Sequence, residues 1–257
     1  MIPKIIHYCW FGRGQMPELA LYCIESWKKY LPDYELRLWN EDTFDVNSVP
    51  YVKEAYSVQK YAFVTDYIRL WALNKFGGIY LDTDVEILKP LDQFLTLPAF
   101  SGYEVIVNTS FCPIMTGLMA SEAGGTWVQE QLAYYNNKHF LKRDGTFANV
   151  FPNTNEPLPN PITITKIMQD NGFVADGKYS VYKGNMHVFP TEYFCPMRWD
   201  TKELVITENT FCIHHFSGSW LNVTATKKTK SQRFFFFIGR CKRWLKKKLR
   251  RMLNADA

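Results

Sequence analysis

Asp82 and Asp84 are the residues of this sequence whose types and spacing most directly indicate chemistry. They follow the apolar residues 79–81, and on a regular strand two side chains two positions apart point to the same side. Two carboxylates held close together raise each other's pKa, and a divalent cation removes that penalty. Oxygen ligands suit Mn²⁺ or Mg²⁺, and such ions typically also take substrate phosphate oxygens. The pair therefore predicts a metal–phosphate site, although solvated loops also carry Asp-x-Asp.

The elements before this pair predict a strand–helix–strand unit. Residues 4–11 and 35–39 have the apolar and alternating patterns of strands, and residues 17–30 between them have a helical period. Residues 60–76 form a second expected helix, which a Gly-Gly pair ends. A strand–helix–strand unit implies a parallel sheet, whose ligands bind beyond the carboxyl ends of the strands. We therefore expect the aspartates to face a crevice of an α/β fold.

The chain after the aspartates has weaker patterns. Residues 85–88 are expected to continue the strand beyond the acids until Pro90 stops it. Further strands are predicted at 99–107 and 210–216, and further helices at 125–135 and 163–171.

Asp66 and Arg69 share one face of the helix 60–76, because their spacing is i, i+3. An exposed pair of this kind would be a local ion pair with little effect on stability. Ala62 and Leu73 share that face, which favours burial. A buried Asp–Arg pair beside a ligand crevice could clamp a sugar or a phosphate.

Two aromatic features stand near the expected strand ends. Trp10 closes the first strand, where its ring could stack on a nucleobase, or it could belong to the core. Residues 214–220, His-His-Phe-Ser-Gly-Ser-Trp, could supply a third metal ligand and phosphate donors on a closing loop, or they could be a strand end with a structural Trp.

The net charge of +5 is unevenly distributed. Residues 1–225 are mildly acidic and form one expected catalytic domain, whereas residues 226–257 are rich in Lys and Arg. The tail has the pattern of an amphipathic basic helix with an aromatic border, and its four phenylalanines at 234–237 favour an anionic membrane surface over nucleic acid.

The sequence predicts a cytoplasmic protein. No secretion signal and no apolar run of about 20 residues is visible, and the six cysteines form no CxxC pair. The absence of Gly-x-Ser-x-Gly, GxGxxG and P-loop motifs argues against hydrolase, dinucleotide and kinase-type functions. With the basic tail, we expect a peripheral position at the inner face of a membrane.

Four segments together resemble glycosyltransferase family 32. They are Ile-His-Tyr-Cys-Trp-Phe-Gly at 6–12, Ala-Phe-Val-Thr-Asp-Tyr-Ile-Arg at 62–69, Gly-Gly-Ile-Tyr-Leu-Asp-Thr-Asp at 77–84, and 215–220. The family contains Asp-x-Asp sugar transferases of bacterial polysaccharide assembly and fungal mannan synthesis and, more distantly, glucosylating toxins. The resemblance implies a GT-A fold, a Rossmann-like mixed sheet flanked by helices with the metal site at a strand end.

The resemblance also implies roles for residues that bind the donor. Trp10 would stack on the base of a nucleotide sugar. Asp66 and Arg69 would contact its sugar, ribose or phosphates, with Tyr80 nearby. Asp82 would contact the ribose or donor sugar and the metal. Asp66, Arg69 and Asp82 are thus the expected catalytic residues.

The metal and the closing loop take their expected residues from the same resemblance. Asp84 would bind the metal directly, and His215 stands where the toxins carry a Glu, so it is the expected third ligand. Ser217, Ser219 and Trp220 would contact the diphosphate as the loop closes. Mn²⁺ is the expected cofactor, with Mg²⁺ as the alternative.

The expected reaction is transfer of a hexose with retention of anomeric configuration. The donor would be a nucleotide sugar, with uridine the expected base and guanosine-linked mannose left open. The acceptor would be a polysaccharide, such as a capsular one, or a lipid-linked oligosaccharide, and a protein acceptor remains an alternative. A metal-dependent phosphatase of the haloacid dehalogenase class also carries a strand followed by Asp-x-Asp, but its downstream acid pair is not found. A sugar-binding module without catalysis is the third hypothesis.

Overall fold

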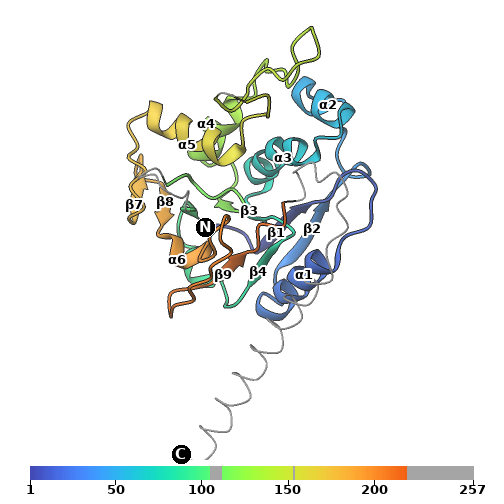
Figure 1. The fold of residues 1–257 in the computed structure, drawn as a ribbon. Coiled ribbons are helices and arrows are strands. Elements are labelled where there is room, and N and C mark those ends of the chain that lie inside the picture. Colours follow the sequence, from blue (N-terminus) through green and yellow to red (C-terminus); the bar gives the residue numbers. More distant parts are fainter. Residues whose placement is uncertain (105–111, 153, 219–257) are drawn as a thin grey trace, which may run out of the picture. The chain divides into compact units, whose positions relative to one another are not determined.

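The computed structural model describes residues 1–104, 112–152 and 154–218 (Figure 1). Within them, one sheet of seven strands has the order β2-β1-β3-β6-β5-β8-β7, and a second sheet pairs β4 with β9. The strands are β1 (Ile5–Cys9), β2 (Glu35–Trp39), β3 (Gly78–Leu81), β4 (Val85–Ile87), β5 (Ala99–Gly102), β6 (Leu118–Ser121), β7 (Ser180–Tyr182), β8 (Met186–Phe189) and β9 (Cys212–His214). The helices are α1 (Glu18–Tyr30), α2 (Pro50–Ser57), α3 (Tyr61–Phe76), η1 (Asp92–Phe94), α4 (Thr126–Ala133), α5 (Asn160–Asp170) and α6 (Thr191–Phe194).

The main sheet is mixed. β1 pairs in parallel with both β2 and β3, as the strand–helix–strand pattern predicts. β3 then pairs antiparallel with β6, and β5 joins β6 antiparallel and β8 in parallel. The expected mixed α/β sheet flanked by helices is confirmed, with parallel pairing among β2, β1 and β3 and between β5 and β8.

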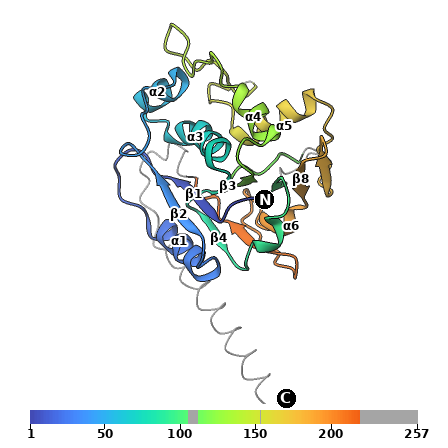
Figure 2. The same ribbon diagram turned by 180° about the vertical axis from the view of Figure 1, so that it is seen from behind.

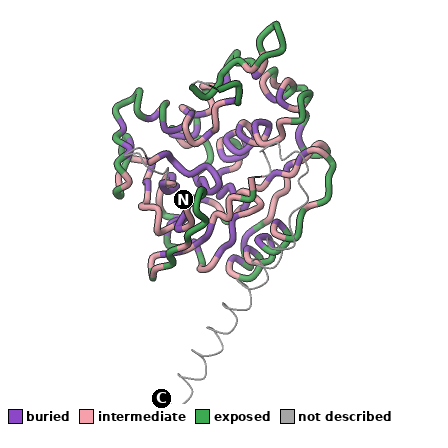
Figure 3. The backbone as a smooth tube through the Cα atoms, viewed as in Figure 1, coloured by how far each residue is buried: buried purple, intermediate pink, exposed green. Residues whose placement is uncertain are grey.

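Helices cover both faces of this sheet (Figures 1 and 2). α3 packs on β1, β3 and β6, with α2 and α4 against it, whereas α1 lies on the opposite side against β4. Two hydrophobic clusters result, one on each face, because successive side chains of a strand point to opposite faces. Tyr80 belongs to the α3 side and its neighbours Ile79 and Leu81 to the α1 side. Figure 3 shows the buried backbone following the central strands and α3.

The passage from α3 to β3 brings the helix directly over the strand that carries the aspartates. Gly77 ends α3 with φ 64°, and Gly78 has φ 105°, both in the region that favours glycine. A Cβ on Gly78 would lie 2.6 Å from the carbonyl oxygen of Ile5. The Gly-Gly pair is therefore required both by the backbone conformation and by the close approach of β1.

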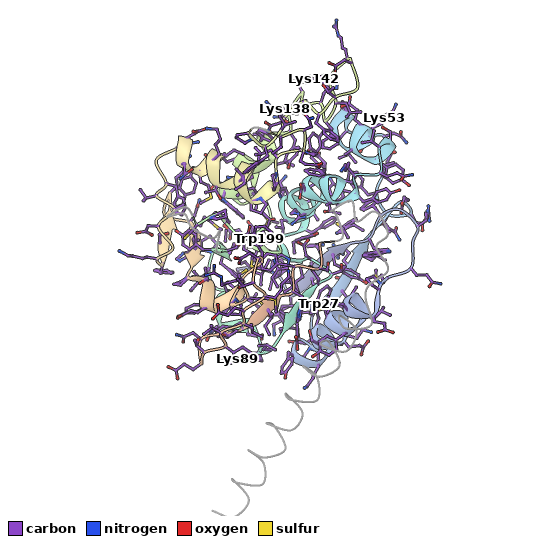
Figure 4. The ribbon with its side chains drawn as sticks, in the orientation of Figure 1. Trp27, Lys53, Lys89, Lys138, Lys142 and Trp199 are labelled. Carbon is purple, nitrogen blue, oxygen red and sulfur yellow. The ribbon has the colours of Figure 1, made fainter. Side chains whose placement is uncertain are left out.

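The segment 82–88 differs from its prediction. Residues 83–84 form a turn, in which the Val85 N–H donates to the Asp82 carbonyl at 3.0 Å. β4 then leaves the main sheet and pairs antiparallel with β9. The indole N–H of Trp27 on α1 donates to the Val85 carbonyl at 2.7 Å and holds β4 in this position. Figure 4 labels Trp27 on this helix. Asp82 therefore precedes the turn and Asp84 lies in it, so the two are not neighbours on one continuous strand.

The other predicted helices and strands are present, with boundaries that differ by a few residues. α4, α5 and β9 lie within or close to the expected ranges, and β5 covers residues 99–102 of the expected strand 99–107. β7 and β8 lie in the range 179–199, where strands and turns are expected to alternate, whereas α2, η1, β6 and α6 have no counterpart among the predictions. The expected boundary at 225/226 and the basic amphipathic tail 226–257 lie outside the described residues. Among the helices that are described, none is long and apolar enough to cross a bilayer.

Candidate metal and donor site

Asp82, Asp84 and His214 meet at the carboxyl end of β3. Each offers one ligand atom, and these atoms all lie within 4.8 Å of one another. Asp82 follows β3, Asp84 precedes β4, and His214 ends β9, so the two-stranded sheet brings the histidine to the aspartates. Two carboxylates and an imidazole suit Mn²⁺, and the carboxylates alone suit Mg²⁺. The side chains present therefore fit a divalent cation.

Asp84 and His214 form an ion pair. His214 Nε2 lies 3.3 Å from Asp84 Oδ1, and the Ser217 N–H donates to Asp84 Oδ2 at 2.7 Å. Burial alone would raise the pKa of Asp84, but His214 and Ser217 hold that pKa well below its usual range. Burial alone would lower the pKa of His214, but the carboxylates of Asp84, Asp82 and Glu104 raise it. The three carboxylates around His214 therefore favour positive charge at this position, whether on the ring or on a bound cation.

His215, the expected third ligand, lies elsewhere. Its Nε2 is 2.9 Å from Glu86 Oε2, and its backbone N–H donates to the Asp84 carbonyl at 3.0 Å. Neighbouring residues of an extended chain point to opposite sides. His214 therefore faces the aspartates while His215 faces away from them, and the geometry favours His214 as the ligand in place of His215.

Asp66, Arg69 and Asp82 form a buried charge network on the α3 side. Arg69 Nη2 lies 3.0 Å from Asp66 Oδ1, and Arg69 Nη1 lies 3.4 Å from Asp82 Oδ1. Nη1 also donates to the Thr116 carbonyl at 2.5 Å. The side chains of Arg69 and Asp66 are only 4% and 9% exposed, whereas Asp82 is 26% exposed. The expected buried pair is therefore present, and Asp82 is its accessible member.

Burial and charge act in opposite directions within this network. Burial raises the pKa of Asp66 to about 7, with Arg69 lowering it in part. Burial would lower the pKa of Arg69, but Asp82, Tyr80 and Asp66 raise it. The guanidinium therefore stays charged and compensates the carboxylates around it.

The buried side chain of Tyr80 helps to position Asp82. Its hydroxyl donates to Asp82 Oδ1 at 2.8 Å, and the Arg69 guanidinium lies 4.5 Å from the centre of its ring. Tyr80 is 1% exposed, so its contact with the site runs through Asp82.

Gly117 allows His214 and Asp82 to approach the sheet. A Cβ at this position would lie 3.1 Å from His214 Cε1 and 3.2 Å from Asp82 Oδ2. These distances are tighter than ordinary van der Waals contact, so a larger residue would displace one of the two candidate ligands.

The other predicted residues are placed differently. Trp10 is half-buried just after β1, and its indole N–H donates to the Gly14 carbonyl at 2.6 Å. Ser217 reaches Asp84 through its backbone. Ser219 and Trp220 lie outside the described residues.

Glu104 was not identified from the sequence. It follows Tyr103 just beyond β5, and its carboxyl lies within 4.8 Å of ligand atoms of His214 and Cys195. Burial raises its pKa to about 7, His214 lowers it in part, and Asp82 raises it. Glu104 is the one charged residue of the strand predicted at 99–107, and this is the signal that could have found it.

The site segment matches a known protein family. Residues 17–100 match the family described as "Glycosyltransferase sugar-binding region containing DXD motif", and this range includes Asp66, Arg69, Asp82 and Asp84. The chain therefore carries such a region, and the predicted resemblance to Asp-x-Asp sugar transferases is confirmed over this segment.

Curated relatives carry names of the same class. Inositol phosphoceramide mannosyltransferase 3 of Schizosaccharomyces pombe is 36% identical over 103 residues, covering 38% of this chain and 29% of that protein. Mannosyl phosphorylinositol ceramide synthase CSH1 of Saccharomyces cerevisiae is 33% identical over 104 residues, covering 39% of this chain and 27% of that protein. The chain thus spans less than a third of the length of these two relatives. Among solved structures, PaToxG Glycosyltransferase has a TM-score of 0.46 and 19% identity, covering 66% of this chain and 69% of that chain.

Proposed function

We propose that this protein is a metal-dependent glycosyltransferase that moves a hexose from a nucleotide sugar to a saccharide or lipid acceptor. One observation carries the proposal. Asp82, Asp84 and His214 converge at the end of β3, inside a chain segment that matches a sugar-binding region with a DXD motif.

We assign a role to each side chain of the site from its exposure and its charge. Asp82 would contact the donor, because it is the accessible member of its network, while Asp66, Arg69 and Tyr80 hold it in place. A divalent cation, Mn²⁺ in the first instance, would be held by the two aspartates and His214 and would act as a Lewis acid toward the donor diphosphate. Preorganised charges of this kind stabilise the negative charge that develops on a leaving phosphate.

The proposed course is retention of anomeric configuration. The anomeric C–O bond to the diphosphate breaks and a bond to the acceptor hydroxyl forms on the same face of the sugar. The acceptor proton passes to the leaving phosphate oxygen. No carboxylate is assigned as a covalent nucleophile.

Donor and acceptor are proposed by class. A uridine-linked hexose is the first candidate, and the names of the mannosyltransferase relatives favour testing guanosine-linked mannose beside it. Those names also contain inositol phosphoceramide, a lipid. A lipid-linked acceptor fits the basic aromatic residues 226–257, which we propose bind an anionic membrane surface at the cytoplasmic face.

A donor panel tests the activity. The full chain is incubated with Mn²⁺ and a set of nucleotide sugars, and the release of nucleoside diphosphate is measured with wild type and Asp84→Asn. We expect release from one donor, reduced at least about 100-fold by the substitution, which corresponds to about 2.7 kcal/mol. Sugar-independent release of inorganic phosphate would instead support the phosphatase alternative, and binding of a sugar without turnover would support the binding module.

Membrane binding is tested separately by truncation before Thr226. The full chain is expected to sediment with anionic liposomes and the truncated chain to remain in solution, with neutral liposomes as the control. Undiminished sedimentation of the truncated chain would refute the role of the tail.

A further inference from the structure

A second group of metal-binding side chains lies beside the first and shares a residue with it. Glu104, Cys195 and His214 each offer one ligand atom, and all of these atoms lie within 4.8 Å of one another. They come from the ends of β5, α6 and β9. Zinc bonds of about 2.0–2.3 Å place tetrahedral ligand atoms roughly 3.5 Å apart, so the three need only small movements to bind one ion.

His214 has a nitrogen that the described residues leave unsatisfied. Its Nε2 faces Asp84, whereas its Nδ1 is buried without a hydrogen-bond partner in the described part of the chain. An unpaired buried polar atom costs free energy, and such atoms are rare in folded proteins. The Nδ1 atom of His214 is therefore available to bind a metal ion, while Nε2 faces Asp84.

The chemistry of the second group differs from that of the first. A thiolate, an imidazole and a carboxylate are the ligands that zinc takes in proteins, and three protein ligands leave a fourth position for water. The softer thiolate favours zinc over Mn²⁺ and Mg²⁺, whereas the two aspartates of the first site favour the harder ions.

A cavity lies next to Cys195. Cys195 is 1% exposed, yet it lines a cavity of about 270 Å³ whose walls include Met197, Val205 and Thr207. This cavity borders the cysteine on a side separate from Asp82 and Asp84, neither of which lines it.

We propose that Glu104, Cys195 and His214 form a zinc site that excludes the cation of the first site, because both sites need His214 and a neutral imidazole has only one nitrogen lone pair to give to an ion. On binding, the Cys195 thiol loses its proton to solvent and the thiolate bonds to the ion. Zinc would thus compete with Mn²⁺ for the protein. The competition rests on the proposed metal at the first site, whereas zinc binding itself does not.

The direct test uses Co²⁺, which substitutes for zinc and reports a bound thiolate by a charge-transfer absorption band. The full chain is titrated with Co²⁺ and then with Zn²⁺. We expect the band to form, to disappear on addition of zinc, and to be absent in Cys195→Ser. Cys212→Ser is the matched control, because Cys212 is equally buried but its thiol donates to the Phe194 carbonyl at 3.1 Å. This variant should keep the band.

Two further outcomes keep the proposal testable if Cys195→Ser folds poorly, which near-ultraviolet circular dichroism would reveal. Glu104→Gln should weaken Zn²⁺ binding at least about tenfold, measured with a competing chelator dye. Mn²⁺ should raise the apparent dissociation constant of zinc in proportion to its concentration. Absence of the band in folded wild type, or its persistence in Cys195→Ser, would overturn the zinc site whether or not the chain hydrolyses a nucleotide sugar. A zinc dissociation constant that does not change with the Mn²⁺ concentration would contradict the proposal that the two sites share His214.

Discussion

The candidate site has two sides that are built differently. The arginine side consists of Asp66, Arg69 and Asp82, which come from one helix and the strand that follows it. The histidine side consists of Asp84, His214 and Ser217, which the pairing of β4 with β9 joins across 133 positions of the chain. On the arginine side the guanidinium pairs with both carboxyl groups before any ligand arrives. On the histidine side, His214 and the backbone N–H of Ser217 balance the negative charge of Asp84. A bound cation can take over this role.

Removing the charge at the centre of the arginine side should have the largest effect on stability. Arg69→Met leaves Asp66 and Asp82 without their buried counter-charge, so we expect the free energy of unfolding to fall by about 3–5 kcal/mol. Urea denaturation measures it. Arg37→Met is the control, because Arg37 pairs with Glu35 at a more exposed position, and its loss should be at most about 1 kcal/mol. Equal losses would contradict the difference between the buried network and a surface pair.

The pH dependence of stability separates the titration of Asp66 from the rest of the site. The pKa of Asp66 is raised from 3.8 to about 7, so between these values the folded chain holds a proton that the unfolded chain has lost. The free energy of unfolding therefore falls as the pH rises through this window. Asp66→Asn cannot titrate, so its decline across the window should be smaller, as measured by denaturation at several pH values. Parallel curves would show that Asp66 does not carry the effect.

The two sides also differ in how far they could be predicted. The arginine side lies in a continuous helix–strand unit, where the 3.6 and 2.0 residue periods determine which side chains share a face. The i, i+3 spacing therefore predicts that Asp66 and Arg69 lie together, as they do, whereas Asp82 joins them in the prediction only through the family resemblance. The histidine side depends on which strand pairs with β4, and no local period encodes that pairing. A shift of one residue along β9 exchanges His214 for His215. Glu104 and Cys195 also come from elements whose partners are distant in sequence.

A small steric change at the junction of the two sides should weaken metal binding without unfolding the chain. Gly117→Ala places a Cβ against both His214 and Asp82, while the backbone at this position does not have a positive φ. We expect Mn²⁺ binding to weaken by up to about tenfold, measured by calorimetric titration. Gly14→Ala adds its Cβ to open space and should leave the affinity unchanged. An unchanged affinity in Gly117→Ala would mean that the two ligands do not need their present spacing.

The Mn²⁺ affinities of His214→Asn and His215→Asn test the central claim most directly. The structure places His214 beside Asp82 and Asp84, and it places His215 against Glu86. Titration of the full chain, followed by the electron paramagnetic resonance signal of free Mn²⁺, should show a loss of at least about tenfold for His214→Asn and little change for His215→Asn. A larger loss for His215→Asn would contradict the assignment of the metal site.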